Sequence, residues 1–415
     1  MSVPRLLAGV RDGRPLWLEG HRALHGACPA PGPELIEAVA SAGLRGRGGA
    51  SYPTAAKLAA VARRRGPRSL LVNGAEGEPM SAKDGILLEL APHLVLDGAF
   101  AAADAVGASA IVIAIRENAR RALGSIDHAL AERGRPARVR VAHVPVSYLA
   151  GEESALIRHL DGGPLLPRVV PPRPHERGLG RCPTLVQNPE TLANVGLIAR
   201  HGAAWFREVG TQDHPGSVLV TFSGAVMRPG VQEVACGTHL ESALQRAGGA
   251  VADVRAVLIG GYHGTWIARE QIGAVTLDDG GLARHDATVA AGVVVALGHG
   301  ACPVQEIART ASWLAGQSAR QCGPCSNGLP AIAAMLTSIA DGRAPRDAMD
   351  RVLRWSSQVR GRGACRLPDG AVRFVESSMR VFADEVAEHA RRGPCPGCRR
   401  PPTLRAPAAH SEVAA

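Results

Sequence analysis

The chain has 415 residues, of which 46% are hydrophobic and 20% charged, and its formal net charge is +10. This balance is typical of a globular protein of about two to four domains and excludes an intrinsically disordered chain. No apolar stretch reaches the roughly 18 uninterrupted residues of a membrane-spanning helix, and the first residues lack the apolar core of a signal peptide.

Alternating helices and strands are predicted for the first half of the chain. Strands that alternate with helices of ordinary length are typical of a parallel α/β sheet. Apolar runs predict strands at 69–73, 110–115 and 138–143, and helical periodicity predicts helices at 34–42, 93–106, 117–133, 149–160 and 191–201. Several prolines between residues 162 and 174 exclude a regular element there.

The pattern changes near residue 210. A short helix at 239–247 among three predicted strands indicates a small α+β module, and residues 302–390 have a helical pattern. The strands are expected at 217–224, 230–234 and 254–259. We therefore divide the chain into a lead-in at 1–30, an α/β domain at 31–210, the α+β module at 211–300, a helical domain at 301–392 and a basic, Pro-rich tail at 393–415.

The positive charge is scattered along the chain. No recognisable nucleic-acid-binding module accompanies it, so we expect no nucleic-acid partner. A positive surface speeds the encounter with negatively charged carriers, which favours an acidic protein partner. Only two of the 47 basic residues are lysines, Lys57 and Lys83. Because ammonium and guanidinium groups are not interchangeable at a tight site, these two positions are candidate ligand contacts.

A glycine-rich loop at 43–49 is the first candidate binding motif. Glycines such as Gly46 and Gly48 let the backbone approach a ligand, and successive free N–H groups can bind a phosphate. Arg47 lies within the loop, and Lys57 follows it closely enough to reach the same anion. Taken alone, such a loop is also compatible with a plain tight turn.

Polar residues at other places could complete a nucleotide site. Asn73, Glu76 and Glu78 directly follow the first predicted strand, where α/β sheets place ligand-binding residues. An asparagine can bond a flavin ring edge or ribityl chain, and carboxylates can accept from nucleotide hydroxyls. Later candidates are Gly151, Glu152, Glu153, Asn188 and Thr191. Glu152 and Glu153 are equally compatible with solvated surface acids.

Five of the nine cysteines fall in the last quarter of the chain. They are Cys322, Cys325, Cys365, Cys395 and Cys398. Disulfides are rare in a reducing compartment, so clustered cysteines there indicate metal or redox chemistry. Two of the spacings are Cys-x-x-Cys pairs, which together match a zinc site. An isolated cysteine such as Cys302 is expected to be a small buried packing residue.

These motifs resemble the NADH-oxidising flavoprotein of respiratory complex I, which is the F subunit of the NADH:quinone oxidoreductase family, with this chain as a divergent member. The matching strings follow the family's order and extend over about residues 35–390. They include Gly-Arg-Gly-Gly-Ala at 46–50, Lys57, Glu78-Pro79, Lys83-Asp84, Gly151-Glu-Glu153 and Asn188-x-Glu-Thr191.

The resemblance implies a Rossmann-like FMN-binding domain, followed by a ubiquitin-like β-grasp module and a C-terminal helical bundle that carries a [4Fe–4S] cluster. It implies that Glu78 and Glu153 face the NADH side. The implied cofactor-binding residues are Gly46, Arg47, Gly48, Lys57, Asn73, Glu76, Glu78, Gly151, Glu152, Glu153, Asn188 and Thr191. No side chain is needed as a general acid or base, because the cofactors carry the chemistry.

The chain departs from the family pattern at three places. The segment 72–79, which contains Glu76 and Glu78 and is called the acidic turn below, has Ala75 where the family has Asp. The Pro-Pro pair is flanked by Val170 and Arg173, where the family has a basic residue and an aromatic one. The first cluster-ligand position holds Ala319 in place of cysteine.

The third departure leaves the cluster site open to several interpretations. Cys322, Cys325 and Cys365 remain as ligands, and Cys395 or Cys398 could supply the fourth thiolate that a cubane cluster normally has. The alternatives are a three-iron cluster, a non-cysteine ligand, zinc at the two Cys-x-x-Cys pairs, and an empty site.

We therefore expect an NADH dehydrogenase that takes a hydride from NADH onto FMN and passes electrons singly through the cluster to a quinone reductase complex or a ferredoxin-like carrier. One alternative is the flavin module of a hydrogenase or formate dehydrogenase. Another is a non-catalytic scaffold subunit that has lost part of the redox chain, which Ala319 and the altered positions Val170 and Arg173 indicate. We expect a cytoplasmic protein, or one held at the inner face of the cell membrane through partner subunits.

Overall fold

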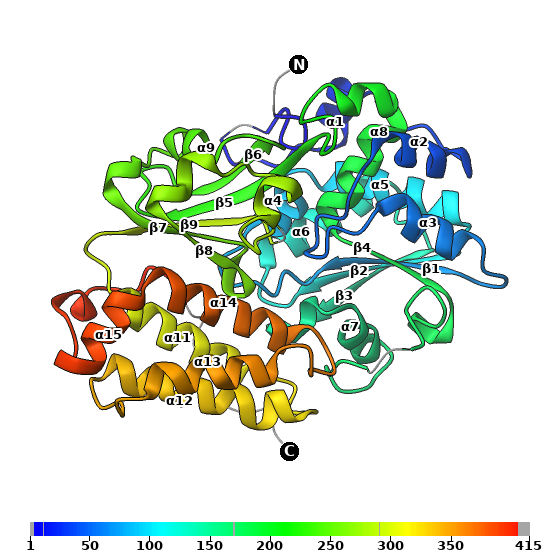
Figure 1. Ribbon diagram of the computed structural model, residues 1–415. Coiled ribbons are helices and arrows are strands. Elements are labelled where there is room, and N and C mark those ends of the chain that lie inside the picture. The colour runs from blue at the N-terminus through cyan, green and yellow to red at the C-terminus, as the bar shows by residue number, and fades with distance from the viewer. Residues whose placement is uncertain (1–3, 11, 169–170, 290, 406–415) are drawn as a thin grey trace.

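A four-stranded parallel sheet forms the N-terminal half of the chain. The computed structural model describes residues 4–10, 12–168, 171–289 and 291–405 (Figure 1). The strands are β1 (Ser69–Gly74), β2 (Ala110–Arg116), β3 (Val139–Val144) and β4 (Thr184–Gln187), in the order β3-β2-β1-β4. All three pairings are parallel. The chain moves outward from β1 to β3 and then returns to the other side of β1, so the order reverses between β1 and β4.

Helices cover both faces of this sheet. They are α1 (Leu18–His25), α2 (Glu34–Ala42), α3 (Thr54–Ala62), α4 (Lys83–Leu90), α5 (Pro92–Val106), α6 (Arg120–Glu132), α7 (Glu153–Leu160) and α8 (Pro189–Arg207). The closest packing is between α5 and α8, because a Cβ atom at Gly98 would lie 1.7 Å from the carbonyl oxygen of Leu192. The two helices therefore cross backbone to backbone, which only glycine permits.

A five-stranded mixed sheet follows. Its strands are β5 (Ser217–Gly224), β6 (Gly230–Ala235), β7 (Val254–Ile259), β8 (Thr265–Ala268) and β9 (Val293–Gly298), in the order β6-β5-β9-β7-β8. β5 and β9 are parallel, and the other pairs are antiparallel. Two short helices, α9 (Leu240–Arg246) and α10 (Asp279–Ala283), lie in the same region.

Both faces of the second sheet are buried. Along β7, Val257 and Ile259 pack into a core shared with α9, whereas Ala256 and Leu258 pack into a core shared with the C-terminal helices. This alternation follows from the two-residue period of a strand. The second core joins the sheet to a bundle of α11 (Pro303–Gly316), α12 (Leu329–Ala340), α13 (Ala348–Val359), α14 (Leu367–Val381) and α15 (Ala383–Arg392).

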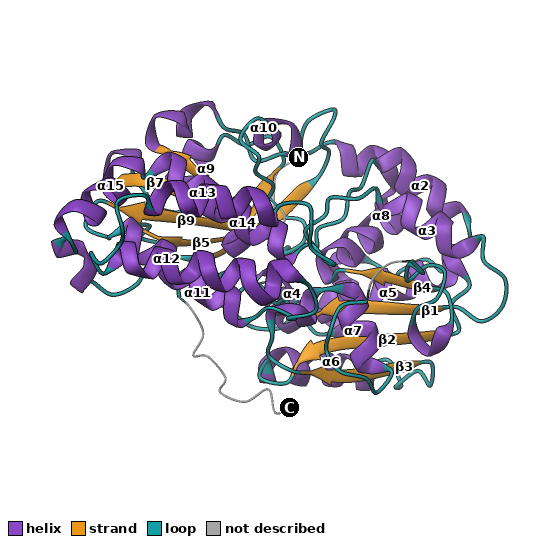
Figure 2. Cartoon of the chain, turned by 60° about the horizontal axis from the view of Figure 1, so that its bottom comes forward, coloured by secondary structure: helices purple, strands orange, loops and turns teal. Residues whose placement is uncertain are grey.

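Figure 2 shows the two sheets side by side, with the bundle against the five-stranded one. The predicted mixed α/β fold with a parallel sheet is confirmed. Within the described ranges, no single helix is long and apolar enough to cross a membrane, although α4 and α5 together pass that test as a pair bent by 96°.

Candidate functional site

The candidate site begins where the order of the parallel sheet reverses. In open α/β sheets, ligands bind outside the carboxyl ends of the strands at such a switch point. Here β1 ends at Gly74, β4 ends at Gln187, and the two strands are neighbours. Asn73 near the end of β1 and Asn188 just after β4 therefore lie on either side of this point. The structure brings most of the predicted cofactor residues here.

The glycine loop rests on the start of α8. The backbone N–H of Arg47 donates to Thr191 Oγ1 at 2.9 Å. A Cβ atom at Gly48 would lie 3.1 Å from Cβ of Asn188, so a larger residue would push the loop away. Gly46 is held by its N–H bond to the carbonyl of Tyr52 at 2.8 Å. The close approach to Asn188 explains why glycine is needed at position 48.

The donors of this loop fit the phosphate of a nucleotide cofactor. Among the described residues, the N–H groups of Gly48, Gly49 and Ala50 have no hydrogen-bond acceptor. Arg47 Nε is likewise buried without a partner in the described chain. Successive free N–H groups form the concave anion sites found in phosphate-binding loops. A cavity beside the loop is lined by Gly46, Arg47, Ser51, Lys83, Glu190 and Gly292.

A second set of contacts links β1 to the segment before α7. Asn73 Nδ2 donates to the carbonyl of Gly151 at 2.9 Å. Gly151 ends a short 3₁₀ helix at Tyr148–Gly151, and Glu152 then caps α7 by accepting the N–H of Ala155 at 2.7 Å. The Glu152 side chain is thus committed to the helix rather than free in solvent.

Lys57 and Glu153 form an accessible ion pair at the same place. Lys57 Nζ lies 3.2 Å from Glu153 Oε2, and the two side chains are 36% and 40% exposed. Partly exposed pairs contribute little stability, so both groups are free to bind a ligand instead.

Lys83, in contrast, is used inside the protein. Its ammonium contacts Asp84 at 2.7 Å, Glu190 at 3.0 Å and Asn188 Oδ1 at 3.3 Å, and its side chain is 3% exposed. Burial alone would lower the pKa of Lys83, but Asp84 and Glu190 outweigh it and raise the pKa above its usual value. Lys83 therefore holds the start of α8 in place.

The two acids of the acidic turn are also buried. Glu76 accepts from Ser81 Oγ at 2.8 Å and from the N–H of Asp84 at 2.9 Å. Glu78 accepts the N–H groups of Met80 and Tyr262 at 3.1 and 2.9 Å. Burial raises the pKa of Glu78 to about 7. The structure thus places Glu78 against Tyr262, in the segment between β7 and β8.

Three cysteines converge in the helical bundle. Cys325 is buried in a π-helical turn at Pro324–Gly328, before α12. Burial, followed by the nearby thiols of Cys322 and Cys365, raises the pKa of Cys325 to about 12. Ala319 packs partly buried in the same core. Three converging thiols fit an iron–sulfur cluster with one position left to another ligand.

The loop that leads from α11 to Cys322 and Cys325 is docked on the segment that contains Tyr148 and Pro167. Gln317 Oε1 accepts the N–H of Tyr148 at 3.0 Å, and Gln321 Nε2 donates to the carbonyl of Pro167 at 3.0 Å. The carboxylate of Glu152 is near enough to help raise the pKa of Cys365, after the larger effect of burial. The cysteine loop and the turn around Gly151 are therefore direct neighbours.

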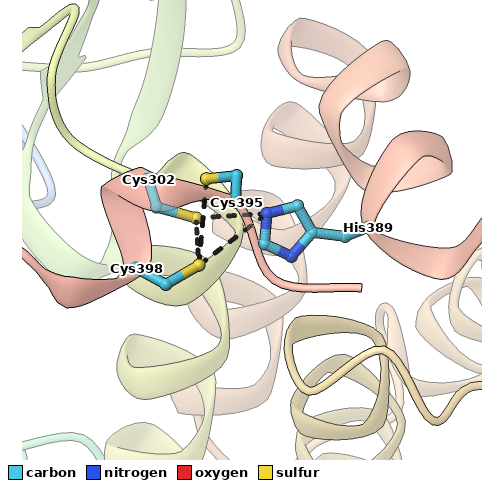
Figure 3. A group of neighbouring side chains, drawn as sticks. All are labelled: Cys302, His389, Cys395 and Cys398. Atoms are coloured by element: carbon cyan, nitrogen blue, oxygen red, sulfur yellow. Dashed lines mark hydrogen bonds between the residues drawn. The ribbon is translucent and has the colours of Figure 1, made fainter. Parts of the chain in front are cut away.

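Cys395 and Cys398 lie in a different group. They meet Cys302 and His389, with all four ligand atoms within 4.8 Å of one another (Figure 3). Cys322, Cys325 and Cys365 do not belong to this group of four. His389 gave no signal in the sequence, because a single histidine near the end of a helix has no informative spacing.

Two family models match the chain. They are the Nuo51 FMN-binding domain over residues 39–197 and the NADH-ubiquinone oxidoreductase-F iron-sulfur binding region over residues 305–389. The F 2 subunit of the NADH-quinone oxidoreductase of Rhizobium meliloti (strain 1021) is 31% identical over 395 residues, which cover 91% of this chain and 94% of that protein. The chain belongs to the NADH-quinone oxidoreductase F-subunit family.

Other members of the family and a solved structure agree. The F subunit of the Streptomyces coelicolor (strain ATCC BAA-471 / A3(2) / M145) NADH-quinone oxidoreductase is 31% identical over 394 residues, with 91% of this chain and 88% of that protein covered. The crystal structure of an NAD+-reducing [NiFe]-hydrogenase in the air-oxidized state matches with a TM-score of 0.84 and 32% identity, covering 94% of this chain and 67% of that one. The predicted family, the NADH dehydrogenase class, FMN and an iron–sulfur region are confirmed.

The departures from the family pattern have different places in the structure. Ala75 is fully buried behind the acidic turn. Arg173 is exposed, with its backbone N–H bonded to Glu176 at 2.9 Å. Val170 lies outside the described residues. Tyr52 is 51% exposed next to the glycine loop and supplies an accessible aromatic ring there.

Proposed function

We propose that the switch point between β1 and β4 is the site where this family member binds FMN and oxidises NADH. The observation that carries the proposal is the convergence of three free loop N–H groups, the Lys57–Glu153 pair and the Asn73–Gly151 contact at one edge of the sheet. FMN, when bound, supplies the chemistry that accepts a hydride and releases electrons one at a time.

The residues of the site divide this work by their chemistry. The N–H groups of Gly48 and Gly49 and the ammonium of Lys57 are the donors for a phosphate or ribityl oxygen. Asn73 orients the Gly151 turn, and Thr191 fixes the loop through the Arg47 N–H. Glu153 is the accessible acid that remains for the hydroxyls of NADH. Glu78 acts by joining the acidic turn to Tyr262 rather than by touching the substrate.

We further propose the domain assignment that goes with this function. Residues 31–210 form the flavin domain, residues 211–300 a ubiquitin-like β-grasp module, and residues 301–392 the cluster domain. In support, the five-stranded sheet has a parallel central pair, β5 and β9, with antiparallel strands outside, and α9 packs on one face.

Cys322, Cys325 and Cys365 are proposed as the protein ligands of the cluster. The loop before Cys322 and Cys325 is held against Tyr148 of the Gly151 turn by Gln317 and against Pro167 by Gln321, which gives electrons a short way out of the flavin domain. The ligand at the Ala319 position would then come from solvent. An acidic redox protein or ferredoxin-like carrier is the proposed partner, since the net charge of +10 favours it.

The proposal is tested with the purified full chain. We expect a yellow protein with bound FMN that NADH bleaches under anaerobic conditions, as followed by flavin absorbance. A protein that carries no flavin and shows no bleaching after incubation with FMN would instead support the scaffold alternative that Ala319 raises.

The cluster ligands are tested by adding the missing thiol. Ala319→Cys would place a fourth cysteine before Cys322, and we expect it to raise the iron and acid-labile sulfide content towards about four of each per chain. Cys325→Ser, which removes a buried thiol, is expected to lower both several-fold. EPR spectroscopy after reduction measures the cluster type. Unchanged iron in both variants would contradict this ligand set.

A further inference from the structure

A second set of side chains of the metal-binding type meets at the start of α11. Cys322, in contrast, follows the end of that helix. Cys302 Sγ is 3.4 Å from Cys398 Sγ and 3.5 Å from His389 Nε2. Cys398 Sγ is 3.8 Å from Cys395 Sγ and 3.9 Å from His389 Nε2. Figure 3 shows the four side chains pointing at one another from three separate segments of the chain.

These distances match the edges of a tetrahedron around one metal ion. Zinc binds thiolates at about 2.3 Å and imidazole nitrogens at about 2.0–2.1 Å, so a tetrahedral site puts two sulfurs about 3.8 Å apart and a sulfur and a nitrogen about 3.5 Å apart. Four of the six separations run from 3.4 to 3.9 Å, and all six are within 4.8 Å. A multi-iron cluster binds its thiolates to different iron atoms, which spreads the sulfurs further apart.

Local structure prepares each ligand for this role. Cys302 is the N-cap of α11, and its sulfur accepts the N–H of Gln305 at 3.4 Å. His389 comes from the last turn of α15 and is 2% exposed. Both ligands are therefore held in place by regular structure.

The other two ligands come from a tight turn that is shaped to approach Cys302. The turn Cys395-Pro-Gly-Cys398 is closed by the bond from the Cys398 N–H to the Cys395 carbonyl at 3.1 Å. A Cβ atom at Gly397 would lie 3.1 Å from both the nitrogen of Cys302 and the carbonyl oxygen of Gly300. Glycine at this position thus lets the turn lie directly on the start of α11.

We propose that Cys302, His389, Cys395 and Cys398 bind one zinc ion in a closed, structural site, separate from the cluster of Cys322, Cys325 and Cys365. Four protein ligands leave no open position, which is the arrangement of structural and not catalytic zinc. The ion would fasten the C-terminal segment to the first and last helices of the bundle.

The segment beyond the zinc ligands shows what the ion would hold. Glu306, in the first turn of α11, accepts the N–H groups of Thr403 and Leu404 at 2.7 and 3.1 Å. Leu404 is 1% exposed, and the N–H of Arg405 lies 3.3 Å from Met80 Sδ. The zinc site is therefore the anchor of a strap that runs from the bundle to the acidic turn.

Metal analysis of the purified full chain tests the proposal. The protein is produced in medium containing zinc, and zinc, iron and acid-labile sulfide are measured per chain. We expect about one zinc ion per chain in the wild type. Cys398→Ser and His389→Gln should each weaken zinc binding by at least about tenfold, and both should keep their iron. Cys28→Ser, at a cysteine far from the group, is the matched control and should keep its zinc.

Cobalt provides a second measurement, whose first part needs only the wild type. After removal of zinc from the wild type with a chelator, added Co²⁺ should give the intense visible and charge-transfer bands of a tetrahedral cobalt–thiolate site. Cys325→Ser should give the same bands, since its thiol belongs to the other set. The proposal is overturned if the wild type binds neither zinc nor Co²⁺, or if Cys398→Ser loses iron and sulfide while zinc is unchanged.

Discussion

At the scale of single residues, the two lysines of this arginine-rich chain have different tasks. Lys83 is enclosed by Asp84, Glu190 and Asn188, whereas Lys57 has one accessible partner, Glu153. Only Lys57 is therefore available to a ligand. The bulkier, planar guanidinium cannot take the place of a compact ammonium beside the glycine loop.

Lys57→Arg is accordingly expected to lose flavin. Loss of one charge-assisted hydrogen bond weakens binding by about 1.5 kcal/mol, or about tenfold. The flavin content per chain, taken from the absorbance ratio, measures this. Arg351→Lys, at an exposed ion pair with Asp347, makes the reverse exchange on the surface and should keep its flavin. Normal flavin in Lys57→Arg would remove Lys57 from the site.

Glu78 makes stability depend on pH. Burial raises the pKa of Glu78 from 4.5 to about 7. Between these pH values, Glu78 is protonated in the folded protein and ionised in the unfolded chain. The stabilising effect of protonated Glu78 is complete below pH 4.5 and is lost as the pH rises through 7, by up to about 3 kcal/mol.

Glu78→Gln should flatten this dependence while keeping an acceptor for the Tyr262 N–H. Urea midpoints at about pH 5 and about pH 8 measure the difference, and we expect it to be smaller in Glu78→Gln than in the wild type. Glu388→Gln, at an exposed ion pair with Arg392, should behave as the wild type. An equal pH difference in all three proteins would contradict the shifted pKa.

Much of the site was predictable residue by residue, because its residues stand in short motifs next to predicted elements. What the sequence could not provide is their orientation. Glu76 and Glu78 have the residue type of ligands but are turned inward, onto Ser81 and Tyr262. The Tyr262 contact spans 184 residues, so only tertiary packing decides it. His389 and Cys302 were missed as ligands because they meet through a tertiary contact across 87 residues.

At the scale of elements, long periodic segments were predicted well and short ones were not. The helix expected at 34–42 and the strand expected at 110–115 agree with α2 and β2 within one residue. β4 was missed because four residues carry no pattern, although it creates the switch point. β8 and β9 were also missed, since a strand with both faces buried lacks alternation.

The crossing of α5 and α8 provides an element-scale prediction. Gly98→Ala would place a methyl group 1.7 Å from the Leu192 carbonyl oxygen, so the helices must separate. We expect a loss of about 3 kcal/mol or more of unfolding free energy, measured by chemical denaturation. Gly124→Ala on α6 has nothing within 4 Å and should stabilise the protein by about 0.5–1 kcal/mol. Equal stability of the two variants would contradict this packing.

At the scale of the whole molecule, net charge is the property that governs encounter with a partner. A chain of charge +10 should reduce an acidic ferredoxin-like carrier at a rate that falls as salt is added. The screening length is about 10 Å at 0.1 M salt, so most of the decrease should occur below that concentration. Reduction of a small neutral quinone is the control, and a salt effect of equal size on both acceptors would argue against steering by charge.

The strap from the bundle to the acidic turn has a practical consequence for protein engineering. Its last described residue, Arg405, lies against Met80. A carrier protein joined directly after Arg405 would therefore be tethered beside Met80 and the acidic turn. Short flexible tethers give effective concentrations in the millimolar range, so such a fusion should exchange electrons at rates that do not depend on dilution.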